Sequence, residues 1–279
     1  QLGKKTALIE KEAFGGTCLN WGCIPTKALI ASAERFHHAA HSEVFGVTAK
    51  GVTFDYAVMA ARKDEIVTRL SGGVQGLLKS NGVTLIAGAA RFEGPNRLSV
   101  VQPDGDTRWL SAATIIIAAG SDAAMPGFLP KDKRVMDSRA FLDLKALPKR
   151  LLVLGGGVIG CEFACMAAAL GTRVTVVEML EDIVMVLDRD VRRVLRKRME
   201  TLGVTLLTGA PLTGIAVKDG TVSGMYKDQA VTGDLLLVAV GRRPNTAALD
   251  LARAGVKIDE RGTIPVDAQG RTNVASIFA

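Results

Sequence analysis

Aromatic residues and cysteines are scarce in this sequence. Phe, Trp and Tyr make up 5% of the 279 residues, which argues against the aromatic platforms that stack on single-stranded nucleic acid. The formal charge is +7, but the basic residues are scattered and form no block. We therefore expect no nucleic acid among the partners. With four cysteines and no secretion signal at its start, the chain is expected to be cytoplasmic, in a reducing environment.

One apolar run imitates a membrane span. Residues 151–170 carry a single charge, Glu162, over roughly the 20 residues that a span needs. Three consecutive glycines at 155–157 interrupt the run, so a strand, a tight turn and a buried helix are favoured, and we expect no membrane segment. The composition, 48% hydrophobic and 23% charged, is that of a globular chain of about two domains. It excludes a disordered chain, a collagen and a small disulfide scaffold.

An internal repeat organises the chain. Residues 2–10 resemble residues 170–178, which lie 168 positions later. Residues 82–89 and 115–120 resemble segments that lie 121 positions later, at 203–210 and 236–241. Three matches in one order predict two copies of one α/β unit. The first copy has 47 additional residues, which include a pair of cysteines.

The second copy contains a dinucleotide-binding pattern. A buried strand at 151–154 leads into a GxGxxG motif at 155–160, a helix at 161–170 and a second strand at 173–177, which ends at Glu178. In this context Gly155 makes the tight turn, Gly157 lets backbone approach a pyrophosphate, and Gly160 permits close helix–strand packing. The helix N-terminus attracts phosphates. Glu178 is placed to accept hydrogen bonds from ribose hydroxyls, which favours NAD over NADP.

The first copy has the acidic strand end, Glu10, but no glycine loop. By the repeat spacing, that loop would begin about 13 residues before Gln1. At the other end, residues 273–279 resemble a strand that stops while it is still apolar. We therefore expect the chain to be a fragment, truncated at both ends.

A cysteine pair, Cys18 and Cys23, lies in the additional residues of the first copy. A helix is expected from about Pro25 to His41, because proline is favoured in a first helical turn. Cys23 would then lie at a helix N-terminus, which stabilises a thiolate, and Lys27 would add positive charge one turn along. A thiol pair in this setting suits reversible disulfide chemistry.

Two other interpretations of the pair remain open. The pattern Cys18–x4–Cys23–x13–His37–x3–His41 comes within one residue of a zinc-finger spacing. A continuous helix would place His37 about 21 Å from Cys23, however, too far for one ion with bonds of about 2 Å. A purely structural disulfide would leave Lys27 and the nucleotide-type units unexplained. We expect no metal site.

Two further cysteines, Cys161 and Cys165, share one face of the helix after the glycine loop. Small side chains let a helix pack against a sheet, so these two are expected to be structural. Glu162 between them is the single charge in a buried run and needs a partner. We expect that partner to be Lys27.

These segments together resemble the class I pyridine nucleotide–disulfide oxidoreductases, and within them the dihydrolipoamide dehydrogenase branch. The resemblance rests on GGTCLNWGCIPTK at 15–27, GGGVIGCEFA at 155–164, AAGS at 118–121 and GRRPNT at 241–246. It implies two Rossmann-like α/β domains, for FAD and NAD, with the FAD domain discontinuous and incomplete. Residues 1–147 would form the FAD domain, 148–266 the NAD domain, and 267–279 a truncated return to the FAD domain.

The resemblance also implies roles for single residues. Cys18 would exchange with a dithiol substrate, Cys23 would be the thiolate at the flavin, and Lys27 would pair with Glu162 near the flavin. The FAD residues implied are Glu10, Lys11, Gly16, Thr17, Lys27, Ala90, Ala119, Gly120 and Ser121. The NAD residues implied are Gly155, Gly156, Gly157, Val158, Ile159, Gly160, Glu178, Pro211 and Gly241.

The implied function is oxidation of dihydrolipoamide with reduction of NAD⁺, through FAD and a Cys18–Cys23 disulfide. Val158 stands where glutathione reductases carry a tyrosine, and this departure favours the lipoamide branch. Ala119 departs from the threonine that is usual in its turn. The implied partners are the dihydrolipoyl groups of a 2-oxo acid dehydrogenase or glycine cleavage complex, and a second copy in a homodimer.

The implied flavin loop and the C-terminal dimerisation domain are absent from the printed residues, so the chain alone is expected to be inactive. Alternatives are a reductase of another disulfide or of mercuric ion, and a non-catalytic NAD-binding or zinc-binding fragment.

Overall fold

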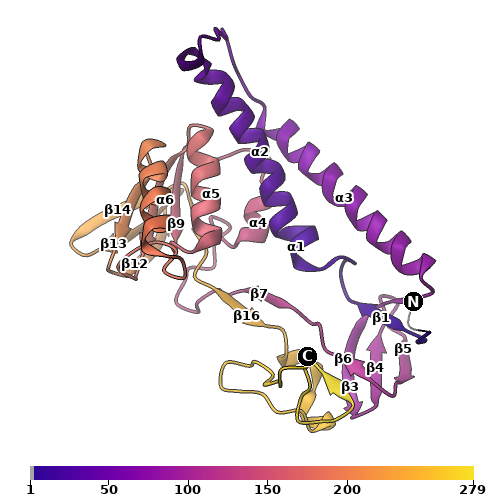
Figure 1. Cartoon of the computed structure of the whole chain (residues 1–279). Coiled ribbons are helices and arrows are strands. Elements are labelled where there is room, and N and C mark those ends of the chain that lie inside the picture. The colour runs from indigo at the N-terminus through magenta and orange to yellow at the C-terminus, as the bar shows by residue number, and fades with distance from the viewer. Residues whose placement is uncertain (1–2) are drawn as a thin grey trace. The chain divides into compact units, whose positions relative to one another are not determined.

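The computed structural model describes residues 3–279, and the chain forms two compact units. The first unit comprises Gln1–Asn20, Thr68–Asp122 and Arg242–Ala279; the second comprises Trp21–Val67 and Ala123–Gly241 (Figure 1). The boundaries expected at 147 and 266 concern nucleotide-binding domains. The division into compact units does not test these two boundaries, so they remain a prediction.

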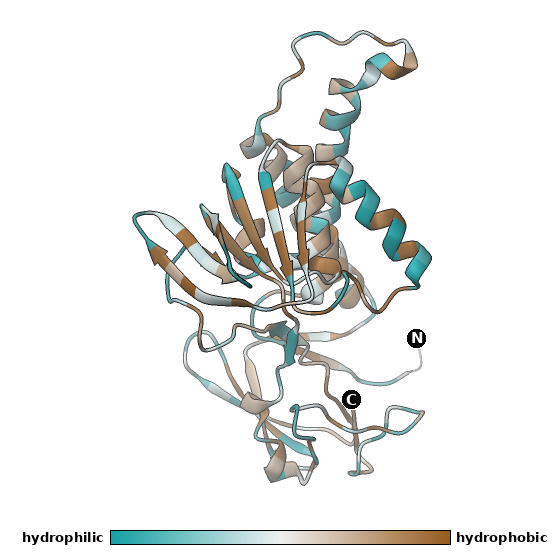
Figure 2. Cartoon of the chain, turned by 90° about the vertical axis from the view of Figure 1, so that its left-hand side faces the viewer, coloured by the Kyte–Doolittle hydropathy of each residue, from teal (hydrophilic) through white to brown (hydrophobic). Residues whose placement is uncertain are grey.

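A five-stranded parallel sheet forms the centre of the second unit. Its strand order is β11-β10-β9-β15-β8. The strands are β8 (Val135–Met136), β9 (Arg150–Leu154), β10 (Arg173–Glu178), β11 (Thr205–Thr208) and β15 (Leu235–Val238). The middle strands are continuous apolar runs because a parallel sheet is covered on both faces. Figure 2 shows this concentration of hydrophobic residues along the sheet.

Helices cover one face of this sheet, and a separate antiparallel sheet packs against it through a second buried cluster. The helices that lie within the second unit are α2 (Cys23–Ala40), α4 (Ser138–Leu142), α5 (Val158–Ala169) and α6 (Arg189–Thr201). Phe163 of α5 meets Phe141 of α4 edge to face, with ring centroids 5.0 Å apart. Leu29 of α2 belongs to the same buried cluster, so α2 packs on this core. The antiparallel sheet contains β12 (Leu212–Lys218), β13 (Thr221–Tyr226) and β14 (Gln229–Gly233).

The first unit contains short parallel pairs and its own antiparallel sheet. Strand β1 (Ala7–Glu10) pairs with β2 (Thr84–Ala87), and β17 (Ile277–Phe278) pairs with β6 (Ile115–Ile116). The three-stranded sheet contains β3 (Ala89–Gly94), β4 (Arg97–Val101) and β5 (Thr107–Ser111). Four elements contain or adjoin the unit boundaries: α1 (Gly16–Trp21), α3 (Tyr56–Ser80), β7 (Ser121–Ala123) and β16 (Arg242–Pro244).

Strand register supports the internal repeat. Glu10 pairs with Ala87 at the end of β1 and β2, and Glu178 pairs with Thr208 at the end of β10 and β11. These are the partners that the 168- and 121-residue spacings require. Each parallel pair is followed by a three-stranded antiparallel sheet, β3–β5 in the first unit and β12–β14 in the second.

The predicted elements around the glycine loop are present with shifted ends. The strand begins at Arg150, and α5 begins at Val158 rather than at 161, because the last glycine of the motif already lies in the first helical turn. Residues 151–170 are therefore strand, turn and helix. Among the described residues, no helix combines the length and apolarity needed to cross a membrane. The strand that we expected within residues 273–279 is present but covers only Ile277–Phe278.

Candidate functional site

Two glycines of the 155–160 loop are required by the backbone around them. Gly155 has φ +108°, and a Cβ there would lie 2.4 Å from the Ala239 carbonyl oxygen. A Cβ at Gly160 would lie 2.0 Å from the Gly155 carbonyl oxygen. The turn and the close packing predicted for these two positions are therefore both present in the structure.

Gly157 is different, because it faces open space. A Cβ built there meets no atom within 4 Å, although the residue is the N-cap of α5. No side chain caps this helix, so the N–H groups of its first turn are not satisfied by a side-chain oxygen. Those N–H groups and the positive end of the helix dipole suit a phosphate, and the absent side chain leaves room for one. The loop thus fits the pyrophosphate of a dinucleotide.

The carboxylate of Glu178, at the end of the neighbouring strand β10, binds backbone N–H groups of the glycine loop and of the segment after β10. Its Oε2 accepts a hydrogen bond from Gly156 N at 2.6 Å, and its Oε1 accepts one from Leu180 N at 2.7 Å. The first unit repeats half of this arrangement, since Glu10 Oε1 accepts from Glu12 N at 2.8 Å. Glu10 and Glu178 are therefore the last residues of matching strands, β1 and β10.

In the first unit, the Ala119–Ser121 turn is held by the segment after Gly241. Asn245 donates to the Gly120 carbonyl oxygen from its backbone N at 3.0 Å and to the Ala119 carbonyl oxygen from Nδ2 at 3.3 Å. Arg242 donates from Nε to Ser121 Oγ at 2.8 Å and from Nη2 to the Ser121 carbonyl oxygen. These roles of Arg242 and Asn245 in the GRRPNT segment were not predicted from the sequence. No local pattern could identify bonds that join residues more than 120 positions apart.

Thr17 lies beside that turn. Gly120 has φ +71°, and a Cβ there would lie 3.9 Å from Thr17 Oγ1. Asn20, at the end of the same helix, donates from Nδ2 to the carbonyl oxygens of Phe14 at 3.2 Å and Gly16 at 3.0 Å. The structure thus brings two of the residues assigned to FAD together and fixes the loop that precedes Cys18.

Cys18 lies within α1, and Cys23 is the first residue of α2. Helix α2 is continuous to Ala40, close to the predicted end at His41. The carbonyl oxygen of Gly22 accepts bonds from Thr26 N at 3.1 Å and Thr26 Oγ1 at 2.7 Å, which fixes the first turn. At the start of the helix, the positive end of the helix dipole favours negative charge on a thiol.

Lys27 and Glu162 form the ion pair that we expected from the sequence. Lys27 Nζ donates to Glu162 Oε1 at 2.6 Å, and this contact joins α2 to α5 within the second unit. The side chains are 55% and 27% exposed, so the pair contributes little to stability. Its effect is to hold a positive charge one turn after Cys23.

Cys161 and Cys165 are packing residues. Burial, followed by the negative groups nearby, raises the pKa of Cys161 to about 12, and its thiol points to the Gly156 carbonyl oxygen at 3.4 Å. Burial also raises the pKa of Cys165, although Arg198 opposes the shift. Both thiols therefore stay protonated near neutral pH and are poor nucleophiles.

The three histidines lie at the far end of α2. The His37 and His41 rings are tilted by 36° with centroids 4.3 Å apart, and His41 Nδ1 lies 2.8 Å from the His37 carbonyl oxygen. Because α2 runs unbroken from Cys23 past His37, the helix rise separates the cysteine from the histidine as the sequence argument assumed. Within residues 3–279 there is no group of three or more His, Cys, Asp or Glu suited to a metal.

The remaining predicted residues lie near the loop and strand ends. Val158 and Ile159 open α5, and Val158 is 48% exposed. Ala90 lies in β3, and Pro211 lies directly before β12. Each residue follows the second strand of its own parallel pair, β2 or β11, so the two positions correspond in the repeat. The carbonyl oxygen of Gly241 accepts from Ala124 N at 2.9 Å. Lys11 follows β1 and is exposed.

Comparisons with known proteins place this geometry in a family. The model of the pyridine nucleotide-disulphide oxidoreductases matches residues 1–279. The chain belongs to this family. A dihydrolipoyl dehydrogenase of Chlamydia pneumoniae is 42% identical over 276 residues, which cover 99% of this chain and 59% of the relative. One from Geobacillus stearothermophilus is 39% identical over 283 residues and covers 100% and 60%.

Solved structures agree with the family and its mixed α/β fold. LpdA of Mycobacterium tuberculosis matches with a TM-score of 0.92 at 27% identity, over 99% of this chain and 61% of that one. The HOCl-induced flavoprotein disulfide reductase RclA of Escherichia coli matches with a TM-score of 0.86 at 31% identity. It covers 99% of this chain and 60% of that one. The chain thus spans about 60% of the length of the relatives that it matches.

Proposed function

We propose that the protein containing this chain oxidises dihydrolipoyl groups and reduces NAD⁺, through FAD and a disulfide between Cys18 and Cys23. The observation that carries the proposal is the start of α2. Cys23 is the first residue of that helix, and Lys27, one turn later, is ion-paired with Glu162 on the helix after the glycine loop. This arrangement supports a thiolate beside a nucleotide-binding element.

The residues of the chain fit the two nucleotides. The open position at Gly157 and the uncapped start of α5 suit the pyrophosphate of NAD. We assign Glu178 to the ribose hydroxyls of NAD, where a 2′-phosphate would be repelled by the carboxylate. In the first unit, Glu10 and the Thr17–Gly120 neighbourhood are assigned to FAD. Bound FAD supplies an acceptor for an electron pair, and bound NAD⁺ supplies the final hydride acceptor.

The chain's own part is thiol–disulfide exchange. A thiolate of the dihydrolipoyl group attacks Cys18 Sγ, so that a mixed disulfide forms and the Cys18–Cys23 bond breaks. Cys23 leaves as a thiolate, stabilised by the helix N-terminus and by the charge of Lys27. The second substrate thiolate then attacks the substrate sulfur of the mixed disulfide. This closes the lipoyl disulfide and releases Cys18. The substrate loses two electrons and two protons, and the two electrons reduce the cysteine pair.

The wider assignments belong to the same proposal. The partners are dihydrolipoyl groups carried by a 2-oxo acid dehydrogenase or glycine cleavage complex, and a second copy of the protein in a homodimer. The four cysteines are compatible with a cytoplasmic location. The relatives named dihydrolipoyl dehydrogenase support the choice of substrate.

Steady-state kinetics of the full-length gene product tests the proposal. NADH formation from dihydrolipoamide and NAD⁺ is measured for the wild type, Cys23→Ser and the matched control Cys161→Ser. We expect Cys23→Ser to lose at least about a thousand-fold in kcat, as the loss of a covalent group does, and Cys161→Ser to stay within about two-fold. Turnover by Cys23→Ser at the wild-type rate would contradict the role of the pair.

A reductase of another disulfide is the second candidate, favoured by the likeness to the Escherichia coli flavoprotein disulfide reductase. The same assay distinguishes it. A kcat/KM for dihydrolipoamide far below that for a different dithiol or disulfide, with NADH or NADPH, would favour this sibling activity. Mercuric ion is a further substrate for that comparison. Stoichiometric zinc, lost together with the fold on mild chelation, would favour the zinc-binding alternative.

A further inference from the structure

The segment between Cys18 and Cys23 carries one aromatic side chain, Trp21, which takes no part in the proposed thiol–disulfide exchange. Trp21 is the last residue of α1, and Gly22 is the N-cap of α2, directly before Cys23. No side chain caps α2. Gly22 permits many backbone conformations and has no side chain that another group could hold. Trp21 is therefore the last side chain before Cys23 through which the start of α2 can be fixed.

Arg139 of α4 lies over the Trp21 ring. The guanidinium carbon of Arg139 is 4.0 Å from the ring centroid, and both residues belong to the second unit. This distance is that of a cation–π contact. Because arginine stays protonated throughout the physiological pH range, the contact persists at any pH at which the proposed enzyme would work.

The helix that carries Arg139 is anchored in the core of the second unit. Phe141 is fully buried and meets Phe163 of α5 edge to face. The carbonyl oxygen of Leu142 accepts a hydrogen bond from the buried Lys63 Nζ at 2.9 Å. Helix α4 therefore offers a fixed point from which Arg139 contacts Trp21.

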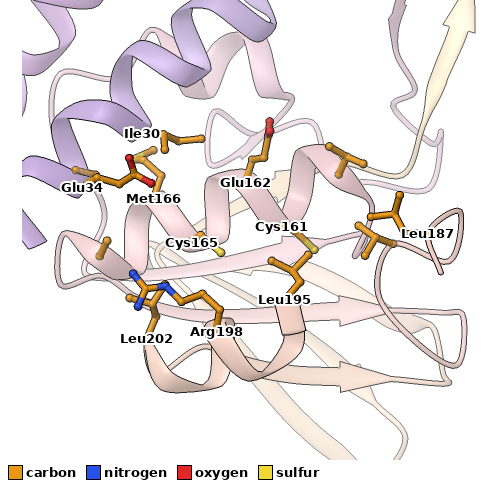
Figure 3. A pocket seen from close by; sticks show the side chains of 14 residues that line it. Ile30, Glu34, Cys161, Glu162, Cys165, Met166, Leu187, Leu195, Arg198 and Leu202 are labelled. Atoms are coloured by element: carbon orange, nitrogen blue, oxygen red, sulfur yellow. The ribbon is translucent and has the colours of Figure 1, made fainter. Parts of the chain in front are cut away.

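The body of α2 is also held by its neighbours. Figure 3 shows Ile30 and Glu34 of α2 at one pocket, which they line together with Cys165 of α5 and Arg198 of α6. The freedom that remains at the start of α2 is thus concentrated at Gly22, between this packed helix and the side chain of the preceding tryptophan.

We propose that Arg139 is a positioning residue for the cysteine pair, a role that rests on the proposed disulfide function. Its contact with Trp21 keeps the junction before Cys23 in one conformation while the Cys18–Cys23 bond opens and closes. The closed disulfide already restrains this junction, so the contact costs less ordering entropy in the closed state than in the open one. By linkage, the contact then favours closure of the disulfide. It raises the effective concentration of the two thiols toward each other.

Equilibration of the full-length gene product in glutathione buffers tests the proposal without a lipoyl substrate. Closure of the pair oxidises two thiols and reduces one glutathione disulfide to two glutathione molecules. Alkylation and mass spectrometry give the closed fraction and hence the effective concentration. We expect Arg139→Leu and Trp21→Leu each to lower it about five-fold, the scale of one cation–π contact. The double variant should show the same loss as either single variant, because both changes remove one contact.

A conservative variant and a matched control accompany these measurements. Trp21→Phe keeps an aromatic ring for Arg139 and should stay within about two-fold of the wild type. The control is the contact between Arg97 of β4 and Trp109 of β5, whose guanidinium carbon and ring centroid are 4.6 Å apart. Arg97→Leu should leave the effective concentration unchanged. Circular dichroism confirms that each variant is folded.

Several outcomes would overturn the positioning role. They are wild-type closure in both single variants, losses that multiply in the double variant, and an equal loss in Arg97→Leu. A shift in Arg139→Leu with none in Trp21→Leu would assign the effect to charge and would overturn the role as well. A wild-type pair that forms no disulfide overturns both this role and the proposed function. A pair that closes in glutathione as expected but is not reduced by dihydrolipoamide overturns the proposed function alone.

Discussion

Gly157 and Gly160 belong to one motif, yet the structure predicts opposite outcomes when each is replaced by alanine. A Cβ at Gly160 would lie 2.0 Å from the Gly155 carbonyl oxygen, which is backbone and cannot rotate away. Overpacking of this kind costs typically 1–3 kcal/mol and occasionally more. A Cβ at Gly157 meets nothing within 4 Å. That change should cost less than about 1 kcal/mol, the scale of a change of N-cap residue.

Affinity for NAD⁺ should change in the opposite order. The space that a methyl group at Gly157 would fill is the space assigned to the pyrophosphate, so Gly157→Ala should weaken NAD⁺ binding at least about ten-fold. This corresponds to roughly 1.4 kcal/mol. Gly160→Ala should reduce stability first, and any loss of affinity should follow from the displaced loop.

Urea unfolding gives the stability of each variant, and calorimetry gives its affinity for NAD⁺. The full-length gene product is used for both measurements. If the Gly157→Ala variant binds NAD⁺ like the wild type, the proposed pyrophosphate site at Gly157 is refuted. Gly157→Ala that is as unstable as Gly160→Ala would show that the loop packs differently from the structure described above.

Three further predictions concern charges and thiols. Burial alone would raise the pKa of Asp182, but bonds from Arg196 and neighbouring groups outweigh it and lower the pKa. A lowered pKa contributes stability above the unfolded value of about 3.9, and this is lost as pH falls through the folded value. Asp182→Asn should thus cost about 1–2 kcal/mol of unfolding free energy at pH 7, with the difference closing in acid. An equal difference at pH 7 and pH 2 would contradict this. Lys27→Met should change the free energy of unfolding by less than about 1 kcal/mol, because the pair with Glu162 is partly exposed. The same variant should lower turnover by about ten-fold or more. Urea unfolding measures the first effect, and steady-state kinetics measures the second. Cys161 should resist alkylation at pH 8 in the folded protein, because its pKa is about 12, and rapid labelling detected by mass spectrometry would disprove this.

The second nucleotide-type unit could be predicted from its sequence because its signals are local. The strand at 150–154, the glycine loop and the acidic end of the next strand follow one another within about 30 residues, as a βαβ unit requires. The partner of Glu162 was also predictable. A lone charge in an apolar run needs compensation, and Lys27 was the candidate that the cysteine segment offered.

Long-range contacts could not be predicted in the same way. The bonds from Arg242 and Asn245 to the Ala119–Ser121 turn join segments more than 120 residues apart. That Glu34 and Arg198 line the same pocket is likewise a product of how α2 and α6 pack. Neither residue type nor spacing along the chain carries that information. The observed helix starts differ from the predicted ones for a simpler reason. Val158 and Cys23 begin their helices before the residues that show apolar periodicity.

The redox state of the four cysteines tests the central claim most directly. The full-length gene product is alkylated before and after anaerobic treatment with dihydrolipoamide, and its peptides are mapped by mass spectrometry. The proposal predicts a Cys18–Cys23 disulfide in the oxidised protein that becomes two alkylated thiols after treatment, while Cys161 and Cys165 remain outside any disulfide. A Cys18–Cys23 pair that forms no disulfide, or one that dihydrolipoamide does not reduce, would contradict the account.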